Sequence, residues 1–347
     1  MQKMTVNTTE KYDILLGAGL KEKVAELLLP FCPTKKVFII TDDIVDRLYG
    51  EEIAESLNRE GFSAEKFVFK NGEASKNISV LSEILEFAAL KGFKRNDLFL
   101  TLGGGVPGDM GGLASALYMR GVPIVQMPTT LLSAVDSSVG GKTAIDLKAG
   151  KNLCGAFKQP KLVIIDTDII KNLPDDIFAC GMGEVIKCNI IKDLPIFDYI
   201  SKGAVKQNIE SVIFDCLALK KEIVEQDEFD TKGIRNILNA GHTVAHAIEL
   251  LSGFSIMHGN AVAMGTVIEA KISEKLGFCN KNTAQTIENA VKNSGLYFEI
   301  PFSKEDIANA CILDKKNKDS RIVFLLPEKI GSCREVKLTA DELINLL

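Results

Sequence analysis

The sequence predicts two domains, an α/β domain built on a parallel sheet and then a helical domain. In the first half of the 347 residues, short apolar runs alternate with segments of helical spacing, which is typical of consecutive β–α–β units. In the second half, apolar residues recur with a period near 3.6 and few runs look like strands. The change falls near residues 168–175, so we expect domains at residues 1–172 and 173–347.

The expected elements follow in order along the chain. Runs rich in Val, Ile, Leu and Phe predict buried strands at residues 36–41, 65–69, 98–102, 123–127 and 162–165. Helical spacing between these runs predicts helices at residues 43–59, 75–90 and 108–118. The same spacing predicts the helices of the second half at residues 177–191, 205–226, 234–251 and 262–276.

The composition excludes several classes of protein. With a net charge of −5, the chain lacks the basic excess expected of a nucleic-acid-binding or anionic-membrane protein. No run approaches the length of a membrane span, and the N-terminal residues lack the apolar core of a signal peptide. The 8 cysteines are scattered singly without a C-x-x-C pair, which indicates reduced thiols. We therefore expect a cytoplasmic protein with no nucleic-acid or membrane partner.

Two glycine-rich motifs suggest phosphate binding. Gly103, Gly105 and Gly108 follow an expected strand in the pattern G-x-G-x-x-G, whose backbone N–H groups can approach a pyrophosphate at a helix N-terminus. This strand is not the first and no clear acidic ribose partner follows, so a tight turn explains the glycines equally well. The later GGKT is not a P-loop, because that motif needs glycine where Asp136 stands. Lys142, within GGKT, could still reach a phosphate.

The three histidines lie within seventeen residues of one another, at His242, His246 and His258. His242 and His246 are separated by four residues, so they share a helix face, and spacing alone favours them as a chelating pair. Glu249 lies on the same face, and Glu184 is an acidic residue in an apolar helix that needs a partner if buried. A lone histidine is more often a core residue, but three clustered histidines favour a functional site, and two histidines and a glutamate with one open position form a catalytic metal site.

Basic residues accumulate beside apolar segments of the same regions. Each alone fits a surface charge, but together they could bind a substrate that carries phosphate and carboxylate groups. They are Arg120, Lys142, Lys151, Lys187, Lys220, Arg235, Lys315 and Lys316.

Four motifs together resemble the 3-dehydroquinate synthase family. They are YMRG, VDSSVGGKT, GEVIK and GHTVAH, within a similarity from NGEASK to the DKK near the end. The resemblance implies an NAD-binding α/β domain with a Rossmann-like parallel sheet and an all-α, metal-binding C-terminal domain. It implies NAD⁺, zinc or cobalt, and conversion of 3-deoxy-D-arabino-heptulosonate 7-phosphate to 3-dehydroquinate and phosphate, the second step of the shikimate pathway. The implied steps are oxidation by NAD⁺, β-elimination of phosphate, reduction and an aldol closure.

The resemblance also implies a role for individual residues. The implied metal ligands are Glu184, His242 and His258, which differ from the pair favoured by spacing. The implied NAD contacts are Asp42, Glu73, Lys76, Gly105, Gly108, Asp109, Thr129, Thr130, Lys142 and Lys151. The implied substrate contacts are Asp136, Lys142, Asn152, Lys187, Lys220, Arg235, Asn239, His246 and one of Lys315 and Lys316. Arg120 resembles an arginine that the family lends to the neighbouring subunit, which implies a homodimer.

The sequence departs from the family pattern at three places. Asn260 stands where the family has a glutamate after the third histidine, and Thr231 stands where an acidic residue precedes Arg235. Residues 169–172 replace threonines that contact the cofactor in the family.

Three other functions are compatible with parts of the pattern. A cyclase for another sugar phosphate would not need Arg235, Asn239 and Lys142 to bind a carboxylate. A polyol dehydrogenase of the same architecture would not need a phosphate site and would release NADH. A binding module without catalysis is disfavoured by the complete set of metal and anion residues.

Overall fold

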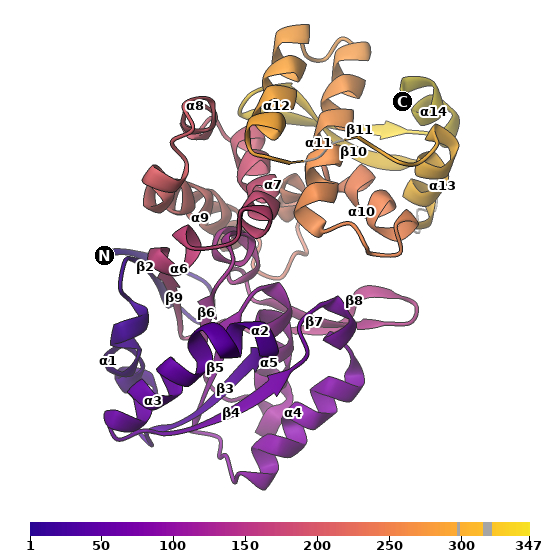
Figure 1. Cartoon of the computed structure of the whole chain (residues 1–347). Helices are drawn as coiled ribbons and strands as arrows, with labels where there is room; N and C mark the ends of the chain where they lie inside the picture. Colours follow the sequence, from indigo (N-terminus) through magenta and orange to yellow (C-terminus); the bar gives the residue numbers. More distant parts are fainter. Residues whose placement is uncertain (297–298, 315–320) are drawn as a thin grey trace. The chain divides into compact units, whose positions relative to one another are not determined.

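A computed structural model describes residues 1–296, 299–314 and 321–347 (Figure 1). The chain forms two compact units. The first contains residues 1–173 and 220–229, and the second contains residues 174–219 and 230–347. The segment 220–229 therefore groups with the first unit, although the sequence boundary places it in the second domain. Its hydrogen bonds explain this, because Glu225 and Glu228 accept from Asn7 and Thr9 near the N-terminus.

The first unit is built on a seven-stranded sheet in the order β1-β2-β9-β6-β5-β3-β4. Only β1 pairs antiparallel, and the other neighbours run parallel. The strands are β1 (Gln2–Val6), β2 (Tyr12–Gly17), β3 (Lys36–Asp42), β4 (Ser63–Phe69), β5 (Leu98–Gly103), β6 (Ile124–Pro128) and β9 (Leu162–Asp166). The expected parallel sheet is confirmed, and the first two strands are additions that the sequence patterns did not predict.

Helices cover both faces of this sheet. The main helices are α1 (Val24–Leu28), α2 (Asp43–Val45), α3 (Glu51–Arg59), α4 (Ile78–Leu90), α5 (Gly105–Leu117) and α6 (Thr167–Lys171). Alternate residues of β3 enter opposite layers: Val37 and Ile39 pack with α1 and α3, whereas Phe38 and Ile40 pack with α4 and α5. This alternation, which follows from the period of two in a strand, makes a three-layer α/β/α domain.

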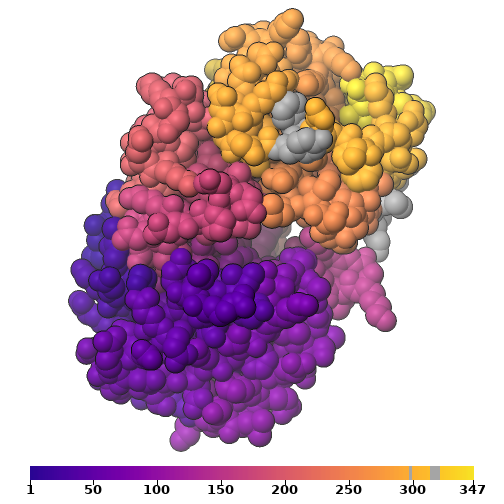
Figure 2. Space-filling view, in the orientation of Figure 1, coloured from indigo at the N-terminus to yellow at the C-terminus, as the bar shows by residue number. Residues whose placement is uncertain are grey.

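An antiparallel hairpin extends from the first unit. Its strands are β7 (Lys142–Leu147) and β8 (Gly150–Phe157), which pair only with each other. The hairpin projects from the surface of this unit in the space-filling view (Figure 2). It carries the lysines of the GGKT region away from the main sheet.

The second unit is largely helical, as expected, but it also contains a hairpin. The helices are α7 (Asp175–Ile191), α8 (Ile196–Ser201), α9 (Ile209–Gln226, which ends in the first unit), α10 (His242–Leu251), α11 (His258–Lys275), α12 (Lys281–Asn293), α13 (Lys304–Asp314) and α14 (Ala340–Leu346). The hairpin strands are β10 (Ile322–Lys329) and β11 (Ser332–Leu338). Their apolar residues, such as Phe324 and Leu326, join the core formed by α10, α11, α13 and α14. An all-α domain was therefore too simple a description.

The expected helix at residues 234–251 is divided in two. A 3₁₀ helix, η8 (Ile234–Asn239), precedes α10. Gly241 separates them with φ = 79°, in the left-handed region that favours glycine. The break makes His242 the first residue of a new helix.

None of the helices in the described part of the chain combines the length and the apolar character that a bilayer crossing requires.

Candidate functional site

Three side chains of the second unit form a compact group of possible metal ligands. Glu184 lies within α7, and His242 and His258 are the first residues of α10 and α11. Oε1 of Glu184 lies 3.3 Å from Nε2 of His242 and 3.2 Å from Nε2 of His258. One ligand atom from each residue lies within 4.8 Å of the others. A carboxylate and two imidazoles at this separation are the donors of a catalytic zinc site with an open position.

Two glycines allow α7 and α11 to come this close. A Cβ atom on Gly183 would collide with the carbonyl oxygen of Gly259, and a Cβ atom on Gly259 would collide with the carbonyl oxygen of Cys180. Gly183 precedes Glu184 and Gly259 follows His258. The close contact of the two backbones therefore places these two ligands opposite each other.

The charges around the group favour a carboxylate and a neutral imidazole. Burial would raise the pKa of Glu184, but Lys187 and His242 hold it well below its usual range. Lys187 is itself buried and pairs directly with Glu184. Burial, with Lys187, lowers the pKa of His242 despite the nearby carboxylate. A metal ion binds a charged carboxylate and a neutral imidazole, so Glu184 and His242 are in the states that suit a divalent ion.

His246 lies outside this group. Its ring centroid is 5.5 Å from that of His242 and the two rings are perpendicular. The two histidines share α10, as their spacing predicts, but only His242 is close to Glu184. The third member of the group is His258, whose distance along the sequence gave no sign of this contact.

Other predicted substrate residues lie on the short helix before α10. Arg235 and Asn239 belong to η8, and Arg235 is 5% exposed. Asn239 lines a cavity of about 270 Å³ with Thr243 and residues of the β10–β11 hairpin. Lys315 and Lys316 lie outside the described residues.

A buried lysine organises the polar residues of the first unit. Nζ of Lys76 lies 2.6 Å from Asp109 and 3.9 Å from Glu73, and it donates to Oδ1 of Asn152 at 2.6 Å. Lys151 also approaches Glu73, at 3.6 Å. Burial lowers the pKa of Lys76, but the charges of Asp109 and Glu73 outweigh it and raise the pKa overall. The sequence-predicted residues thus form one network of acceptors and cations.

The N-terminus of α5 adjoins this network. The helix begins at Gly105 and includes Gly108 and Asp109 in its first turns. Thr129 donates its backbone N–H to Gly103, and a Cβ atom on Gly104 would contact Thr130 at 3.4 Å. The unpaired N–H groups at such a helix start attract anions, so the glycines have a use beyond a tight turn.

One predicted cofactor residue, Asp42, and the segment that departs from the family pattern have structural roles. Oδ1 of Asp42 accepts from the backbone N–H groups of Ile44 and Val45 and so caps α2. Its second carboxylate oxygen would be the one available to a ligand. In residues 169–172, which differ from the family pattern, the side chains of Ile169 and Ile170 are buried in the core.

Three further predicted residues lie in the first unit. Lys220 donates to Oδ1 of Asp136 at 2.6 Å and to its carbonyl oxygen at 2.5 Å. Arg120 has a left-handed backbone with φ = 64°, next to Met119 with φ = 47°.

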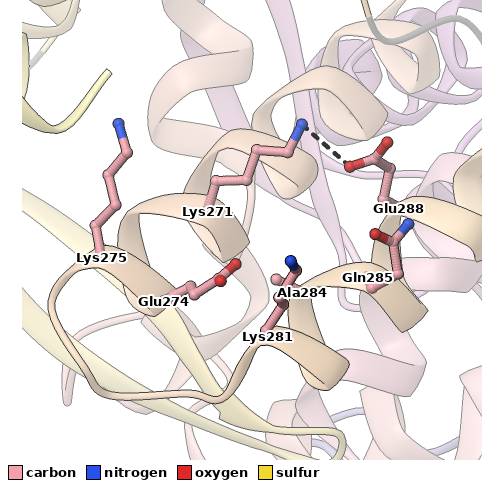
Figure 3. A pocket seen from close by; sticks show the side chains of 7 residues that line it. All are labelled: Lys271, Glu274, Lys275, Lys281, Ala284, Gln285 and Glu288. Carbon is pink, nitrogen blue, oxygen red and sulfur yellow. Dashed lines mark ion pairs between the residues drawn. The ribbon is translucent and has the colours of Figure 1, made fainter.

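A separate cavity lies in a different part of the second unit. It has a volume of about 410 Å³ and lies between α11 and α12 (Figure 3). The figure shows the ion pair of Lys271 and Glu288 across it, at 3.1 Å. Lys275 and Lys281 also line it, and none of the described residues predicted for the site does so.

Comparison with known proteins identifies the family. Family models described as the 3-dehydroquinate synthase N-terminal and C-terminal domains match residues 66–180 and 181–317. A 3-dehydroquinate synthase of Alkaliphilus metalliredigens is 39% identical over 356 residues, covering 100% of this chain and 98% of the relative. The chain belongs to the 3-dehydroquinate synthase family. The resemblance inferred from the sequence motifs is confirmed.

Two solved cyclases share this fold. A 2-deoxy-scyllo-inosose synthase in complex with carbaglucose-6-phosphate, NAD⁺ and Co²⁺ has a TM-score of 0.89 at 23% identity, with 99% of both chains covered. A 2-epi-5-epi-valiolone synthase of Streptomyces hygroscopicus with NAD⁺ and Zn²⁺ also has a TM-score of 0.89 at 23% identity, covering 99% of this chain and 97% of the other. At this identity the likeness supports the fold, and the family assignment comes from the sequence relatives.

Proposed function

We propose that this chain is a 3-dehydroquinate synthase, which converts 3-deoxy-D-arabino-heptulosonate 7-phosphate to 3-dehydroquinate and phosphate. The observation that carries the proposal is the group of Glu184, His242 and His258, within 4.8 Å, in a chain of this family. The reaction would make the chain a carbon–oxygen lyase of the shikimate pathway. A homologous relationship at 39% identity along the full chain supports this substrate over other sugar phosphates.

The metal centre would be formed by Glu184, His242 and His258. Zinc or cobalt fits their one oxygen and two nitrogen donors, and ions of both kinds accompany the related cyclases. A bound divalent ion acts as a Lewis acid that lowers the pKa of a substrate hydroxyl. Lys187 holds Glu184 in its charged form, so the chain keeps this ligand ready for an ion.

The dinucleotide would be NAD⁺, held by the first unit. Its cationic and acidic network supports this assignment: lysines suit the phosphates, and Glu73 and Asp109 can accept from ribose hydroxyls. The N-terminus of α5, with Gly105 and Gly108, suits the pyrophosphate. When bound, NAD⁺ would supply a reversible oxidation, and the later reduction would regenerate it within each turnover. We also retain Asp42, Thr129, Thr130, Lys142 and Lys151 as its contacts.

The substrate's anionic groups call for several cations. We assign Arg235 to the carboxylate, because a guanidinium binds it through two hydrogen bonds, with Asn239 beside it on η8. His246 would donate a hydrogen bond to the phosphate oxygens and take part in proton transfer there. The other proposed substrate residues are Asp136, Lys142, Asn152, Lys187, Lys220 and Lys315. Each binds or orients the substrate, which fixes the reacting atoms for the later steps.

We further propose a homodimer in the cytoplasm. Exposed apolar residues beside Arg120, namely Leu117 at 51% and Met119 at 45%, suit a subunit interface. Arg120 would then reach the neighbouring site. A cytoplasmic location agrees with eight cysteines held as thiols.

One experiment tests the function directly. Phosphate release from 3-deoxy-D-arabino-heptulosonate 7-phosphate is measured with catalytic NAD⁺ and zinc, while NADH absorbance is followed. We expect stoichiometric phosphate without net NADH. Accumulation of NADH without phosphate would instead indicate a dehydrogenase. Formation of neither phosphate nor NADH would refute this substrate.

A further inference from the structure

The helix that carries His242 begins without a capping side chain of its own. Its N-cap residue is Gly241, so the acceptor comes from α11 instead. The carboxylate of Glu269 accepts the backbone N–H of Gly241 at 2.8 Å and that of Val244 at 3.4 Å. Glu269 is 1% exposed. One buried carboxylate thus satisfies two donors at the start of α10 and fixes the backbone of its first residue.

A second buried carboxylate, on α10, contacts the first residue of α11. Glu249, in the last turn of α10, is 5% exposed, and its Oε2 lies 3.4 Å from Nδ1 of His258. A carboxylate only accepts, so Nδ1 donates its proton to Glu249, and Nε2, which faces Glu184, is the nitrogen that a metal ion would take once its proton is displaced. The carbonyl of Ala240 lies 3.1 Å from Nδ1 of His242 and has the same effect on that ring.

The two contacts form a reciprocal arrangement between neighbouring helices. α10 supplies Glu249 to the first residue of α11, and α11 supplies Glu269 to the start of α10. Neither carboxylate belongs to the group of three ligands. Each is buried and contacts the part of the chain that bears one of the two histidines. The contact of Glu249 with the ring of His258 is the usual arrangement behind a metal-bound histidine, whereas Glu269 acts on the backbone that carries His242.

We propose that Glu249 and Glu269 form a carboxylate brace that positions His258 and His242 for metal binding. Both are positioning residues, because neither would touch the ion or the substrate. Glu249 fixes the tautomer and the orientation of the His258 ring, and Glu269 fixes the place of His242 on its helix. The inference rests on the metal centre proposed above.

The test compares Glu249→Gln and Glu269→Gln in the full chain, with Glu274→Gln as the control. Glu274 also lies on α11, but it lines the cavity of Figure 3, which none of Glu184, His242 and His258 lines. Zinc dissociation constants are measured by competition with a chelating dye, and melting temperatures are measured without metal. We expect about tenfold weaker zinc binding in both variants, as for other residues behind a ligand, and no change in the control. We also expect Glu269→Gln to lower the metal-free melting temperature by about 2–4 °C, because the amide has one acceptor oxygen and leaves one of the two N–H groups at the start of α10 without its acceptor.

The outcomes separate this inference from the proposed metal centre. A wild-type chain that does not bind zinc would refute the metal centre and the brace together. Wild-type binding with a dissociation constant within twofold in either variant would overturn the brace alone. Ring-nitrogen NMR of the unaltered, zinc-loaded protein provides a test that needs no variant. Zinc on Nε2 with a protonated Nδ1 in His258 is expected, and zinc on Nδ1 would contradict the role of Glu249.

Discussion

Nε2 of His258 lies 3.2 Å from Oε1 of Glu184, so the first residue of α11 meets the middle of α7. His246, in contrast, lies one helical turn beyond His242 and outside the ligand group. The division of roles among the three histidines can therefore be tested by removing them separately.

We expect His258→Ala to weaken zinc binding by more than about 100-fold. Even residues that only hydrogen-bond to a metal ligand contribute about 10–100-fold to metal affinity. His246→Ala is expected to keep zinc affinity within about threefold and to slow phosphate release. Equilibrium dialysis with metal analysis measures the first effect, and the phosphate assay measures the second. Loss of zinc from the His246→Ala protein would contradict these roles.

Zinc uptake should release a proton from His258. Burial lowers the pKa of His258, but the carboxylates of Glu184 and Glu249 raise it to about 10. A ligand imidazole must be neutral on its metal-facing nitrogen, so zinc displaces this proton and zinc affinity rises with pH up to about 10. Calorimetry in buffers of different ionisation enthalpy should give close to one proton released at pH 7.5. Affinity that is constant between pH 6 and 9 would refute the expectation.

The same shift has a consequence for the stability of the protein without zinc. The folded pKa lies above the unfolded value of roughly 6.5. The charged His258 therefore stabilises the fold fully below pH of about 6.5, and this stabilisation is lost as the pH rises through about 10. Urea unfolding from pH 6 to 10 measures it, with His258→Gln as the variant in which the loss should be reduced.

Sequence and structure agree best where one local pattern determines one element. The run KVFIIT predicts β3 because its alternate residues fill two apolar layers, and the structure has β3 at Lys36–Asp42. Helical spacing likewise predicts that His242 and His246 share α10. Such features depend on residues close in sequence, so a single chain contains the information.

Features that depend on distant backbone contacts were harder to predict. The apolar period continues through residues 234–251, but Gly241 breaks the helix with a left-handed backbone. The contact of His258 with Glu184 requires α11 to pack against α7, and nothing in their spacing of 74 residues signals it. The structure places His258 beside Glu184 and His242, the residues with which the family motifs grouped it, whereas local spacing favoured His246. Glu269 could have been noticed as a lone acid in the apolar run of α11.

Removal of the buried lysine should weaken dinucleotide binding and the fold together. Lys76→Met leaves Asp109 without its partner at 2.6 Å and removes the cation between Asp109 and Glu73. Breaking a buried pair in this way costs about 3 kcal/mol of unfolding free energy. We expect at least tenfold weaker NAD⁺ binding by calorimetry at a temperature where the variant is folded. Lys70→Met, which replaces an exposed residue nearby, is the control. Equal NAD⁺ affinities in the two variants would contradict the assignment of Lys76 to the NAD⁺ site.

Arg235→Ala should affect the substrate more than the metal. Arg235 lies on η8, outside the group of Glu184, His242 and His258, so zinc affinity is expected to stay within about threefold. Loss of a charge-assisted, two-point contact with a carboxylate should raise KM by about 10–100-fold, which corresponds to the 1.5–3 kcal/mol of hydrogen bonds to charged groups. The phosphate assay measures KM, with Lys281→Ala at the surface cavity as the control. An unchanged KM would remove Arg235 from the carboxylate site.

The contact between α10 and α11 should tolerate no side chain at Gly265. A Cβ atom there would collide with the carbonyl oxygen of Gly241 and lie 2.9 Å from the backbone nitrogen of Ala245. Backbone atoms cannot rotate away as a side chain can, so Gly265→Ala should force the helices apart and lower the unfolding free energy by about 2 kcal/mol. Because the displaced helix begins at His242, zinc affinity should fall as well. Gly105→Ala is the control for stability, since its added methyl group would meet Ser137 at 3.6 Å, an ordinary contact. Urea unfolding and zinc titration of both variants decide the matter, and a Gly265→Ala protein as stable as the wild type would show that the two helices can separate without loss.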